Sequence, residues 1–450
     1  MSALAQFLSW KNVAVSGSDR SLHHPESASL REKLSSIGCT LFEQNGSGIN
    51  EHTDALCIST AIEPDNPDIA AALKRSLPII HRSDVLAAIV KEYRTIAVAG
   101  TSGKSTVTAM LFEFLSACGK SPSLISGAAL KRLEGHAMIG NAFKGSSDLL
   151  VIEADESDGT LVKYKPAASV FLNVSKDHKS IDEVKTMFVR LAQQSKQSIR
   201  NADDPLLSDL VTTRTFSLYA PSDWRPEHVA TGREGGLLIR DGIEYRLPLP
   251  GIYNLSNCAA ALSVAEMFGC TPEKLRSATP LFEGVARRFS ITKTDKDIMV
   301  VDDFAHNPEK IRAAVSAARM IAPRIIALYQ PHGFGPTRFL REEYRRLFKT
   351  LFFDHDILCL LPIYYAGGTA SKDISAVDLK NDLGDVPFSV FAPEHRDDLL
   401  PFLESESEPG DCIIVMGARD PSLPFYVKKI IDLFMIPKSS RGTDVAFSPM

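Results

Sequence analysis

Short apolar runs alternate with stretches of helical spacing along most of the chain. The sharpest example is the run 96–99, which breaks at Gly100 and leads through a polar turn into an apolar-periodic stretch over 107–115. The run is typical of a buried strand, and the stretch after it is typical of a helix. Strands that alternate with helices form parallel sheets, with ligands at the carboxyl ends of the strands. We therefore predict an α/β fold with mostly parallel sheets.

The runs fall into groups that predict three domains, because 450 residues are too many for one ordinary core. We place the domains at 1–93, 94–290 and 291–437, with a tail at 438–450. The strands expected in the first domain are 12–16, 39–42, 55–58 and 78–80, and those expected in the third are 298–301, 325–329, 357–361 and 412–415. Residues 1–10 are predicted as a helix, so the strand that normally opens such a sheet is missing from the pattern.

The turn after 96–99 has the composition of a phosphate-binding loop. Its glycines allow backbone N–H groups to close on an anion, and the start of the following helix adds partial positive charge. A lysine there reaches the outer phosphates and the next hydroxyl binds magnesium, which predicts a site for a nucleotide and Mg²⁺. A plain turn without a ligand is the alternative, but the strand and helix on either side favour the nucleotide site. The residues assigned to this loop are Gly100, Thr101, Ser102, Gly103, Lys104, Ser105 and Thr106.

Polar residues also follow other apolar runs of the second domain. Glu153 ends the run 149–153 and begins a group of acids that extends to Asp158. Such a group is usually a solvated loop, but its place directly after a strand favours a metal role for Glu153. His178 follows the run 168–173, and a single histidine is more often structural than a ligand. Asn254 and Asn257 are three residues apart and so share one face of a predicted helix.

The first and third domains carry polar residues at the same kind of position. Ser18 and Asp19 follow the first expected strand, and Ser59 and Thr60 follow the third, which predicts substrate contacts in the first domain. In the third domain each expected strand ends in polar or glycine-rich residues. These residues predict that functional groups line the carboxyl edge of a second parallel sheet, at 302–308, 330–336, 363–368 and 416–420.

Composition narrows the class of protein. A hydrophobic content of 44% and a charged content of 23% are those of a globular chain, and the net charge of −5 gives no support to nucleic-acid binding. No apolar run reaches membrane-spanning length, and no signal pattern opens the chain. The seven cysteines are scattered, which indicates buried thiols in a reducing compartment rather than a zinc site or disulfides. We therefore expect a cytoplasmic protein, and the oligomeric state is not predicted.

Several separated motifs, spread over residues 1 to about 430, together resemble those of the Mur ligases, the ATP-dependent amide-forming enzymes of peptidoglycan precursor assembly. Within the family they are most similar to members that join L-alanine to UDP-N-acetylmuramate, and the murein peptide ligases are close relatives. The motifs are G-T-x-G-K-S-T at 100–106, E-A-D-E-S-D at 153–158, N-x-x-x-D-H at 173–178, N-A-D-D-P at 201–205, Y-N-L-S-N at 253–257, R-R-F at 287–289 and D-D-F-A-H-N-P at 302–308.

The resemblance implies a domain that binds a UDP-sugar, a central ATPase, and a C-terminal domain that closes over ATP and brings the amino acid. It implies UDP-N-acetylmuramate and L-alanine as partners and an acyl phosphate as the intermediate. The catalytic residues implied are Lys104, Glu153, His178 and His306, and the metal ligands are Ser105, Glu153 and His178. Asn254 and Asn257 are implied at the adenine, Arg288 and Asp303 at the ribose and phosphates, and His332 at the amino acid.

The chain departs from the family pattern at a few places. The first strand and its glycine loop are expected just before Met1, and we favour a start codon that lies further upstream. Ser102 and Ser105 stand where L-alanine-adding members carry histidine and threonine, although serine still offers a hydroxyl to the metal. The stretches 333–336 and 419–421 are atypical, which leaves the added amino acid open. The alternatives are another acid or amine as substrate (murein tripeptide recycling or a specialised peptide), an ATP-binding paralogue without ligase activity, and a small-molecule kinase.

Overall fold

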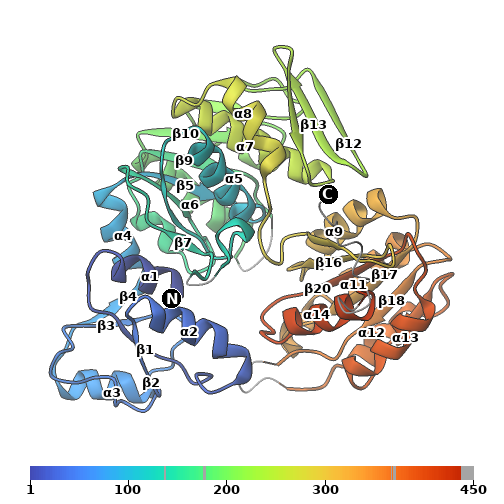
Figure 1. Cartoon of the computed structure of the whole chain (residues 1–450), viewed down its shortest axis with the longest axis horizontal. Helices are drawn as coiled ribbons and strands as arrows, with labels where there is room; N and C mark the ends of the chain where they lie inside the picture. The colour runs from blue at the N-terminus through green and yellow to red at the C-terminus, as the bar shows by residue number, and fades with distance from the viewer. Residues whose placement is uncertain (136–137, 176–178, 366, 368–370, 437–450) are drawn as a thin grey trace, which may run out of the picture. The chain divides into compact units, whose positions relative to one another are not determined.

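The computed structural model describes residues 1–135, 138–175, 179–365, 367 and 371–436. The chain divides into two compact units, Met1–Ala286 and Arg287–Met450, and each is described by itself (Figure 1). Among the described residues, no helix has both the length and the apolar character that crossing a bilayer requires.

The first unit begins with two small parallel sheets rather than one. Strand β1 pairs only with β2, and β3 pairs only with β4. No residue of these four strands is buried, although parallel sheets are normally covered on both faces. The elements are α1 (Ser2–Ser9), β1 (Ser16–Ser18), α2 (Ala28–Ser36), β2 (Thr40–Phe42), β3 (Leu56–Ile58), α3 (Pro67–Lys74), β4 (Ile79–His81) and α4 (Arg82–Glu92). The chain thus reaches its first strand after a helix, as the sequence predicts, but that strand is Ser16–Ser18 and not the predicted 12–16.

A seven-stranded sheet forms the centre of the first unit, in the order β11-β10-β9-β5-β8-β6-β7. Its pairs are parallel except β6 with β7, and β5 lies between β8 and β9. The carboxyl ends of β5, β8 and β9 therefore meet at one edge. The strands are β5 (Arg94–Ala99), β6 (Ser123–Ile125), β7 (Ala142–Phe143), β8 (Leu149–Glu153), β9 (Ala168–Phe171), β10 (Gln197–Asn201) and β11 (Arg214–Phe216).

Alternate residues of β5 face two cores, as the period of a strand requires. Ile96 and Val98 pack with α5 and α7 on one face, whereas Ala97 and Ala99 pack with α1, α4 and α6 on the other. The helices are α5 (Lys104–Ala117), α6 (Ile181–Gln194), α7 (Ile252–Met267) and α8 (Pro272–Ala278). A separate antiparallel sheet, which the sequence did not predict, consists of β12 (His228–Gly232), β13 (Gly235–Arg240) and β14 (Ile243–Leu247).

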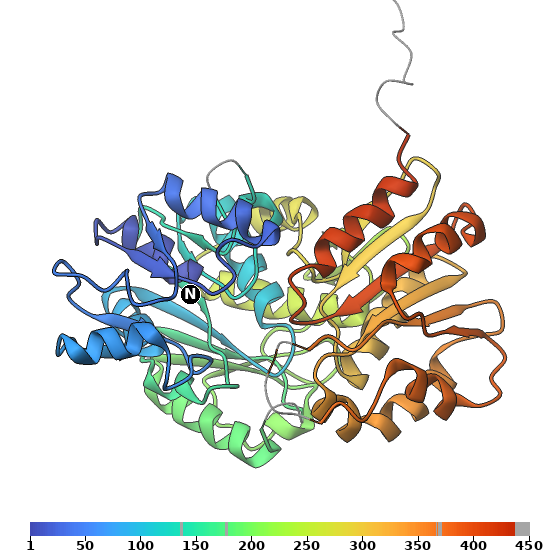
Figure 2. The same cartoon turned by 90° about the horizontal axis from the view of Figure 1, so that it is seen from below.

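The second unit is a six-stranded sheet in the order β15-β16-β20-β17-β18-β19, parallel except for β15. Helices cover both of its faces (Figure 2). The four strands predicted from apolar runs correspond to β16, β17, β18 and β20, and the sequence missed the two edge strands. The strands are β15 (Ser290–Lys293), β16 (Met299–Asp303), β17 (Ile325–Gln330), β18 (Ile357–Leu360), β19 (Ser389–Phe391) and β20 (Cys412–Gly417).

The helices of the second unit lie between its strands in the chain. Residues of α13 and α14 share one core with the sheet, and α9, α11 and α12 contact the strands or each other. These helices are α9 (Pro308–Ile321), α10 (Phe334–Phe339), α11 (Arg341–Leu351), α12 (Ala376–Leu383), α13 (Leu399–Glu406) and α14 (Leu423–Leu433). Short 3-10 helices lie at Pro25–Ser27, Lys131–Leu133, Thr160–Lys163, Pro205–Leu207, Thr279–Leu281 and Arg396–Asp398.

Candidate active site

The phosphate-binding loop connects β5 to α5, where the sequence predicts it. Gly103 has a φ of 86° and stands immediately before the helix, a conformation that favours glycine. A Cβ atom at this position would also lie 2.4 Å from the Asn257 side-chain oxygen. Any other residue would therefore strain the backbone and collide with α7, which explains why glycine precedes Lys104.

The segment after β9 holds the first half of this loop. The Asn173 side chain accepts a 2.8 Å hydrogen bond from Ser102 N–H and donates one of 3.0 Å to the Ser102 carbonyl oxygen. The Thr101 N–H donates to the Asn173 carbonyl oxygen at 3.1 Å. The amides of Thr101 and Ser102 thus already have partners. The N–H groups at the start of α5 are suited to a phosphate, because the start of a helix carries partial positive charge.

Lys104 lies among acids that follow β8. Its ammonium donates to the Gly100 carbonyl oxygen and to Glu156 Oε2, both at 2.8 Å, and lies 3.8 Å from Asp155 Oδ1. Burial acts to raise the pKa of Asp155, but the Lys104 ammonium and bonds from Ser157 outweigh it, so that the pKa is lowered. Glu156 is buried, and its pairing with Lys104 keeps the ammonium at the mouth of the loop.

Glu153 ends β8 beside the loop, and its carboxylate is oriented by the residues that follow β6. Ser126 is buried and donates from Oγ to Glu153 Oε1 at 2.8 Å. A Cβ atom on Gly127 would lie 2.9 Å from Glu153 Oε2, so a side chain at this position would displace the carboxylate. The sequence analysis missed both residues, although a Ser-Gly pair directly after an apolar run was a usable signal.

The oxygen donors near the loop suit magnesium. The Glu153 carboxylate and the Ser105 hydroxyl are hard oxygen ligands, and Mg²⁺ is usually held by one or two carboxylates together with substrate phosphates and water. No group of three His, Cys, Asp or Glu side chains suited to a metal occurs in the part of the chain that the structure describes. His178, the third predicted ligand, lies outside the described residues.

The two predicted adenine contacts are both buried on α7. The Asn254 side chain donates to the Pro250 carbonyl oxygen at 2.7 Å and so fixes the turn that opens the helix. Asn257 faces Gly103 of the phosphate loop. The structure therefore brings Asn257 to the loop, whereas the amide nitrogen of Asn254 has a partner in its own turn.

The predicted sugar-nucleotide contacts are divided between the two small sheets. Ser18 donates to the buried carboxylate of Asp68, and Asp19 accepts from the Ser21 N–H at 2.8 Å. Ser59 and Thr60 follow β3, in the other sheet, and Ser59 accepts from the Ala61 N–H at 3.4 Å. One sheet therefore does not hold all four residues.

In the second unit, Asp303 fixes the backbone around it. One carboxylate oxygen accepts from Phe289 N–H and the other from Ala305 N–H, both at 2.7 Å. Burial raises the pKa of Asp303 to about 6, although the Arg288 guanidinium and these two bonds act in the opposite direction. Arg288 also lies over the Phe304 ring, 4.8 Å from its centre. Asp303 and Arg288 are thus neighbours in the structure.

His306 and His332 lie together at the same edge of this sheet, with ring centres 5.4 Å apart. His306 Nδ1 is 2.8 Å from the Phe304 carbonyl oxygen, so it carries the proton in the neutral ring and Nε2 carries the lone pair. The His306 carbonyl oxygen accepts from the hydroxyls of Tyr344 at 3.0 Å and Tyr329 at 3.2 Å. These bonds hold a potential base in a fixed orientation.

Comparison with known sequences agrees with this arrangement. Residues 1–94 match the profile of the Mur ligase family catalytic domain, 98–265 that of the Mur ligase middle domain, and 287–419 that of the Mur ligase glutamate ligase domain. The chain belongs to the Mur ligase family.

Individual members of the family are similar over almost the whole chain. The UDP-N-acetylmuramate–L-alanine ligase of Pelotomaculum thermopropionicum is 32% identical over 93% of this chain and 92% of its own. The protein of the same name from Symbiobacterium thermophilum is 33% identical over 93% and 90%. The chain and these two relatives thus match over nearly their whole lengths.

Solved structures of Mur ligases share the fold. The UDP-N-acetylmuramate–alanine ligase of Thermotoga maritima superposes with a TM-score of 0.77 at 25% identity, covering 96% of each chain. A murein peptide ligase of Psychrobacter arcticus gives a TM-score of 0.68 at 20% identity, over 99% of this chain and 97% of its own, which is a likeness of fold.

Proposed function

We propose that this Mur ligase uses ATP to join L-alanine to the carboxylate of UDP-N-acetylmuramate, releasing ADP and phosphate, in peptidoglycan precursor synthesis. The observation that carries the proposal is the full-length similarity to relatives of that name, at 32% identity over 93% of the chain. The phosphate loop and its surroundings supply the groups that such a reaction needs.

The first half-reaction brings anions together. The muramyl carboxylate attacks the γ-phosphate of ATP to form an acyl phosphate, and each pair of unit charges about 4 Å apart costs on the order of 4 kcal/mol at a surface-like dielectric. Lys104 and the N–H groups at the start of α5 lower this cost by placing positive charge beside the phosphates. When bound, Mg²⁺ supplies further positive charge there, and Ser105, Glu153 and His178 are the residues proposed to hold it.

When ATP binds, the Lys104 ammonium exchanges its bond to Glu156 for a bond to a phosphate oxygen. In the structure its ammonium is bonded to Glu156. Anionic phosphate oxygens compete for the same ammonium, so ATP binding replaces one charge-assisted bond with another. The Lys104 side chain stays close to the loop throughout, because the Gly100 carbonyl oxygen also accepts from it.

The second half-reaction needs a neutral amine. The amine attacks the acyl phosphate through a tetrahedral intermediate, and a nearby base takes its proton. We propose His306 as that base, because the bond from Nδ1 to the Phe304 carbonyl oxygen directs the lone pair of the neutral ring to Nε2. Arg288 and Asp303 are proposed to contact the nucleotide from the second unit, and His332 to contact the amino acid.

We propose the cytoplasm as the compartment. The seven cysteines are free, six of them are buried, and Cys57 is partly exposed. Unpaired thiols at scattered positions are typical of a reducing compartment.

A second candidate is the same chemistry with another amine. It is favoured by the stretch 333–336, Gly-Phe-Gly-Pro, which is atypical of members that add L-alanine. A third candidate, an ATPase without ligase activity, has no structural observation in its favour. Asn173, Glu156 and Ser126 orient the loop, its lysine and Glu153 in detail, and a chain that does not use the site has no need of such contacts.

Product analysis distinguishes these candidates. We expect mass spectrometry of a reaction with Mg-ATP, UDP-N-acetylmuramate and L-alanine to detect a sugar nucleotide that has gained one alanine and lost one water. A new amide only with other amines would support the second candidate. ADP without any new amide would support the third.

A further inference from the structure

The motif N-A-D-D-P at 201–205 supplies no group to the proposed reaction, but two of its side chains bond to the segment that follows β9. The motif begins at Asn201, the last residue of β10, and β10 lies beside β9 in the central sheet (Figure 1). The register pairs Arg200 with Phe171, the last residue of β9, so the two strands end side by side. The motif is therefore a neighbour of residues 172–175.

Residues 172–175 lie along the phosphate loop. Asn173 bonds to Ser102 through its side chain and accepts from the Thr101 N–H through its carbonyl oxygen. Ser175 N–H donates to the Thr101 hydroxyl at 3.0 Å, and this hydroxyl donates to the Ser175 carbonyl oxygen at 3.3 Å. A shift of residues 172–175 would therefore shift the loop.

Asp204 and Asn201 hold the backbone on each side of Asn173. Asp204 Oδ2 accepts from the Val174 N–H at 2.8 Å. The side-chain amide of Asn201 donates to the Leu172 carbonyl oxygen at 3.1 Å. The residue that bonds to the loop is thus held from both of its chain neighbours by the same motif.

Both motif side chains are themselves fixed. Asp204 Oδ1 accepts from the Leu206 N–H at 2.9 Å and so caps the 3-10 helix Pro205–Leu207. Asn201 is buried, and its side-chain oxygen accepts from the Asp203 N–H at 3.0 Å. Every oxygen of the two side chains therefore has a backbone donor, which is typical of a structural support rather than of a ligand group.

We propose that Asp204 and Asn201 are positioning residues for the nucleotide. They hold residues 172 and 174, which fixes the place of Asn173, and Asn173 in turn fixes the backbone of Ser102 in the phosphate loop. They raise the affinity for ATP through this chain of bonds and without touching ATP. The inference rests on the proposed function in taking ATP as the nucleotide of this loop.

Asp203, the neighbour of Asp204 in the motif, is a matched control. Its carboxylate accepts from the N–H groups of Leu218 at 2.6 Å, Tyr219 at 3.2 Å and Ala220 at 2.8 Å. These are bonds of the same kind, but they hold the turn after β11 and not residues 172–175. A loss of stability without a loss of loop position is therefore what Asp203→Ala should show.

Isothermal titration calorimetry of the full chain with Mg-ATP alone tests the proposal. Asp204→Ala should raise the Kd for ATP roughly tenfold, because a bond to a charged acceptor is lost beside Asn173. Asp204→Asn keeps one acceptor oxygen for two N–H groups, so it should raise the Kd less. Asn201→Ala removes a neutral bond and should raise the Kd about two- to fivefold. Asp203→Ala should keep the wild-type Kd while lowering the melting temperature at least as far as Asp204→Ala.

A double-mutant cycle tests whether Asp204 acts through Asn173. Asn173→Ala removes both side-chain bonds to Ser102 and should raise the Kd for ATP roughly tenfold. Residues that act through one another are not additive. When Asn173 is already alanine, Asp204→Ala should therefore raise the Kd by less than about threefold. A Kd in the double variant equal to the product of the two single effects would overturn the proposed route.

The outcomes separate this inference from the proposed function. An unchanged Kd in Asp204→Ala, or an equal rise in Asp203→Ala, would overturn the positioning role and leave the ligase reaction standing. Circular dichroism identifies a variant that does not fold, and Asp204→Asn then carries the test, with an unchanged Kd as the contrary result. If wild type binds Mg-ATP but forms no alanyl product, the proposed reaction fails and the Kd pattern still decides the inference. Absence of Mg-ATP binding by wild type would overturn both.

Discussion

The Lys104 ammonium forms a 2.8 Å ion pair with the carboxylate of Glu156, at the point where the phosphate loop becomes α5. Both side chains are largely buried, with exposures of 14% and 7%, so water weakens the pair less than it weakens a surface ion pair. The lysine that the sequence assigns to ATP therefore has a protein partner, and in the proposed function the nucleotide must compete with Glu156 for it.

Removal of Lys104 should abolish catalysis and preserve the fold. We expect Lys104→Ala to reduce phosphate release by roughly 100- to 1,000-fold or more, because a fixed donor to the developing charge is lost. Circular dichroism should remain that of wild type. Lys91→Ala, at an exposed position on α4, is the control and should keep full activity. Phosphate release from Lys104→Ala at the wild-type rate would place the phosphate site elsewhere.

Removal of the negative charge of Glu156 should raise the affinity for ATP. Glu156→Gln frees the ammonium of its competing carboxylate, so we expect the KM for ATP to fall roughly two- to tenfold. Asp155→Asn should have a smaller effect, since Asp155 lies 3.8 Å from the ammonium. The measurement is ATP-dependent phosphate release at saturating Mg²⁺. A higher KM for ATP in Glu156→Gln would instead assign Glu156 to the metal or the nucleotide.

Glu153 and Ser126 should both control the requirement for magnesium, but to different degrees. Glu153→Gln removes the proposed ligand and should raise the Mg²⁺ concentration for half-maximal activity sharply. Ser126→Ala leaves the ligand and removes the hydroxyl that orients it, so we expect a rise of about tenfold. Ser116→Ala is the control, because that hydroxyl bonds only within α5. An unchanged magnesium titration in Glu153→Gln would remove Glu153 from the metal site.

Glu113 makes the first unit sensitive to pH. It is buried on α5, and neither side-chain oxygen has a hydrogen-bond partner among the described residues. Burial raises the pKa of Glu113 to about 7, although Arg132 acts against the shift. Because the folded chain holds this proton more tightly than the unfolded chain, its contribution to stability is greatest below the unfolded pKa and is lost as pH rises through 7.

Glu113→Gln should therefore stabilise the first unit at pH 8, by at most about 3 kcal/mol, and make little difference near pH 4. Urea unfolding followed by tryptophan fluorescence measures this unit, because both tryptophans, Trp10 and Trp224, lie in it. Glu234→Gln, at an exposed position, should have the same stability as wild type at both pH values. If the difference in the free energy of unfolding between Glu113→Gln and wild type does not depend on pH, the pKa of Glu113 is not raised by folding.

The strand ends that carry the candidate site were predictable from the sequence, because the signals that mark them lie within a few consecutive residues. Apolar runs followed by polar residues mark β5 and β8, and the glycine turn before Lys104 marks the phosphate loop. These signals depend on a few consecutive residues. The central placement of β5 between β8 and β9 then brings the ends together without any further information.

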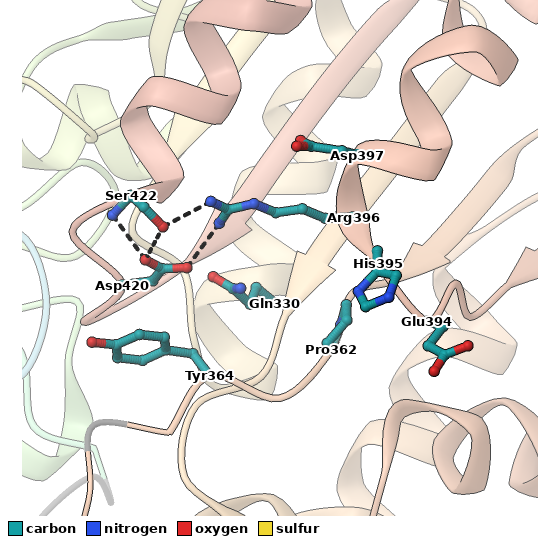
Figure 3. A pocket seen from close by; sticks show the side chains of 9 residues that line it. All are labelled: Gln330, Pro362, Tyr364, Glu394, His395, Arg396, Asp397, Asp420 and Ser422. Carbon is teal, nitrogen blue, oxygen red and sulfur yellow. Dashed lines mark hydrogen bonds and ion pairs between the residues drawn. The ribbon is translucent and has the colours of Figure 1, made fainter. Parts of the chain in front are cut away.

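The contacts that orient the site were not predictable, because they depend on how strands pair. Ser126 reaches Glu153 since Ile125 of β6 is in register with Ile152 of β8. Asn173 reaches Ser102 since β9 lies beside β5. Arg396, in the wall of a pocket of the second unit, belongs to no motif and follows β19, an edge strand of three residues, so its pairing with Asp420 appears only in the folded chain (Figure 3).

The most direct test of the account is phosphate release from Mg-ATP with UDP-N-acetylmuramate and L-alanine, each left out in turn. We predict that release requires both the sugar nucleotide and L-alanine, because the muramyl carboxylate accepts the phosphoryl group from ATP and phosphate leaves when the amine displaces it from the acyl phosphate. Release that continues without the sugar nucleotide would contradict the proposed reaction, because ATP would then be hydrolysed without phosphorylating the muramyl carboxylate.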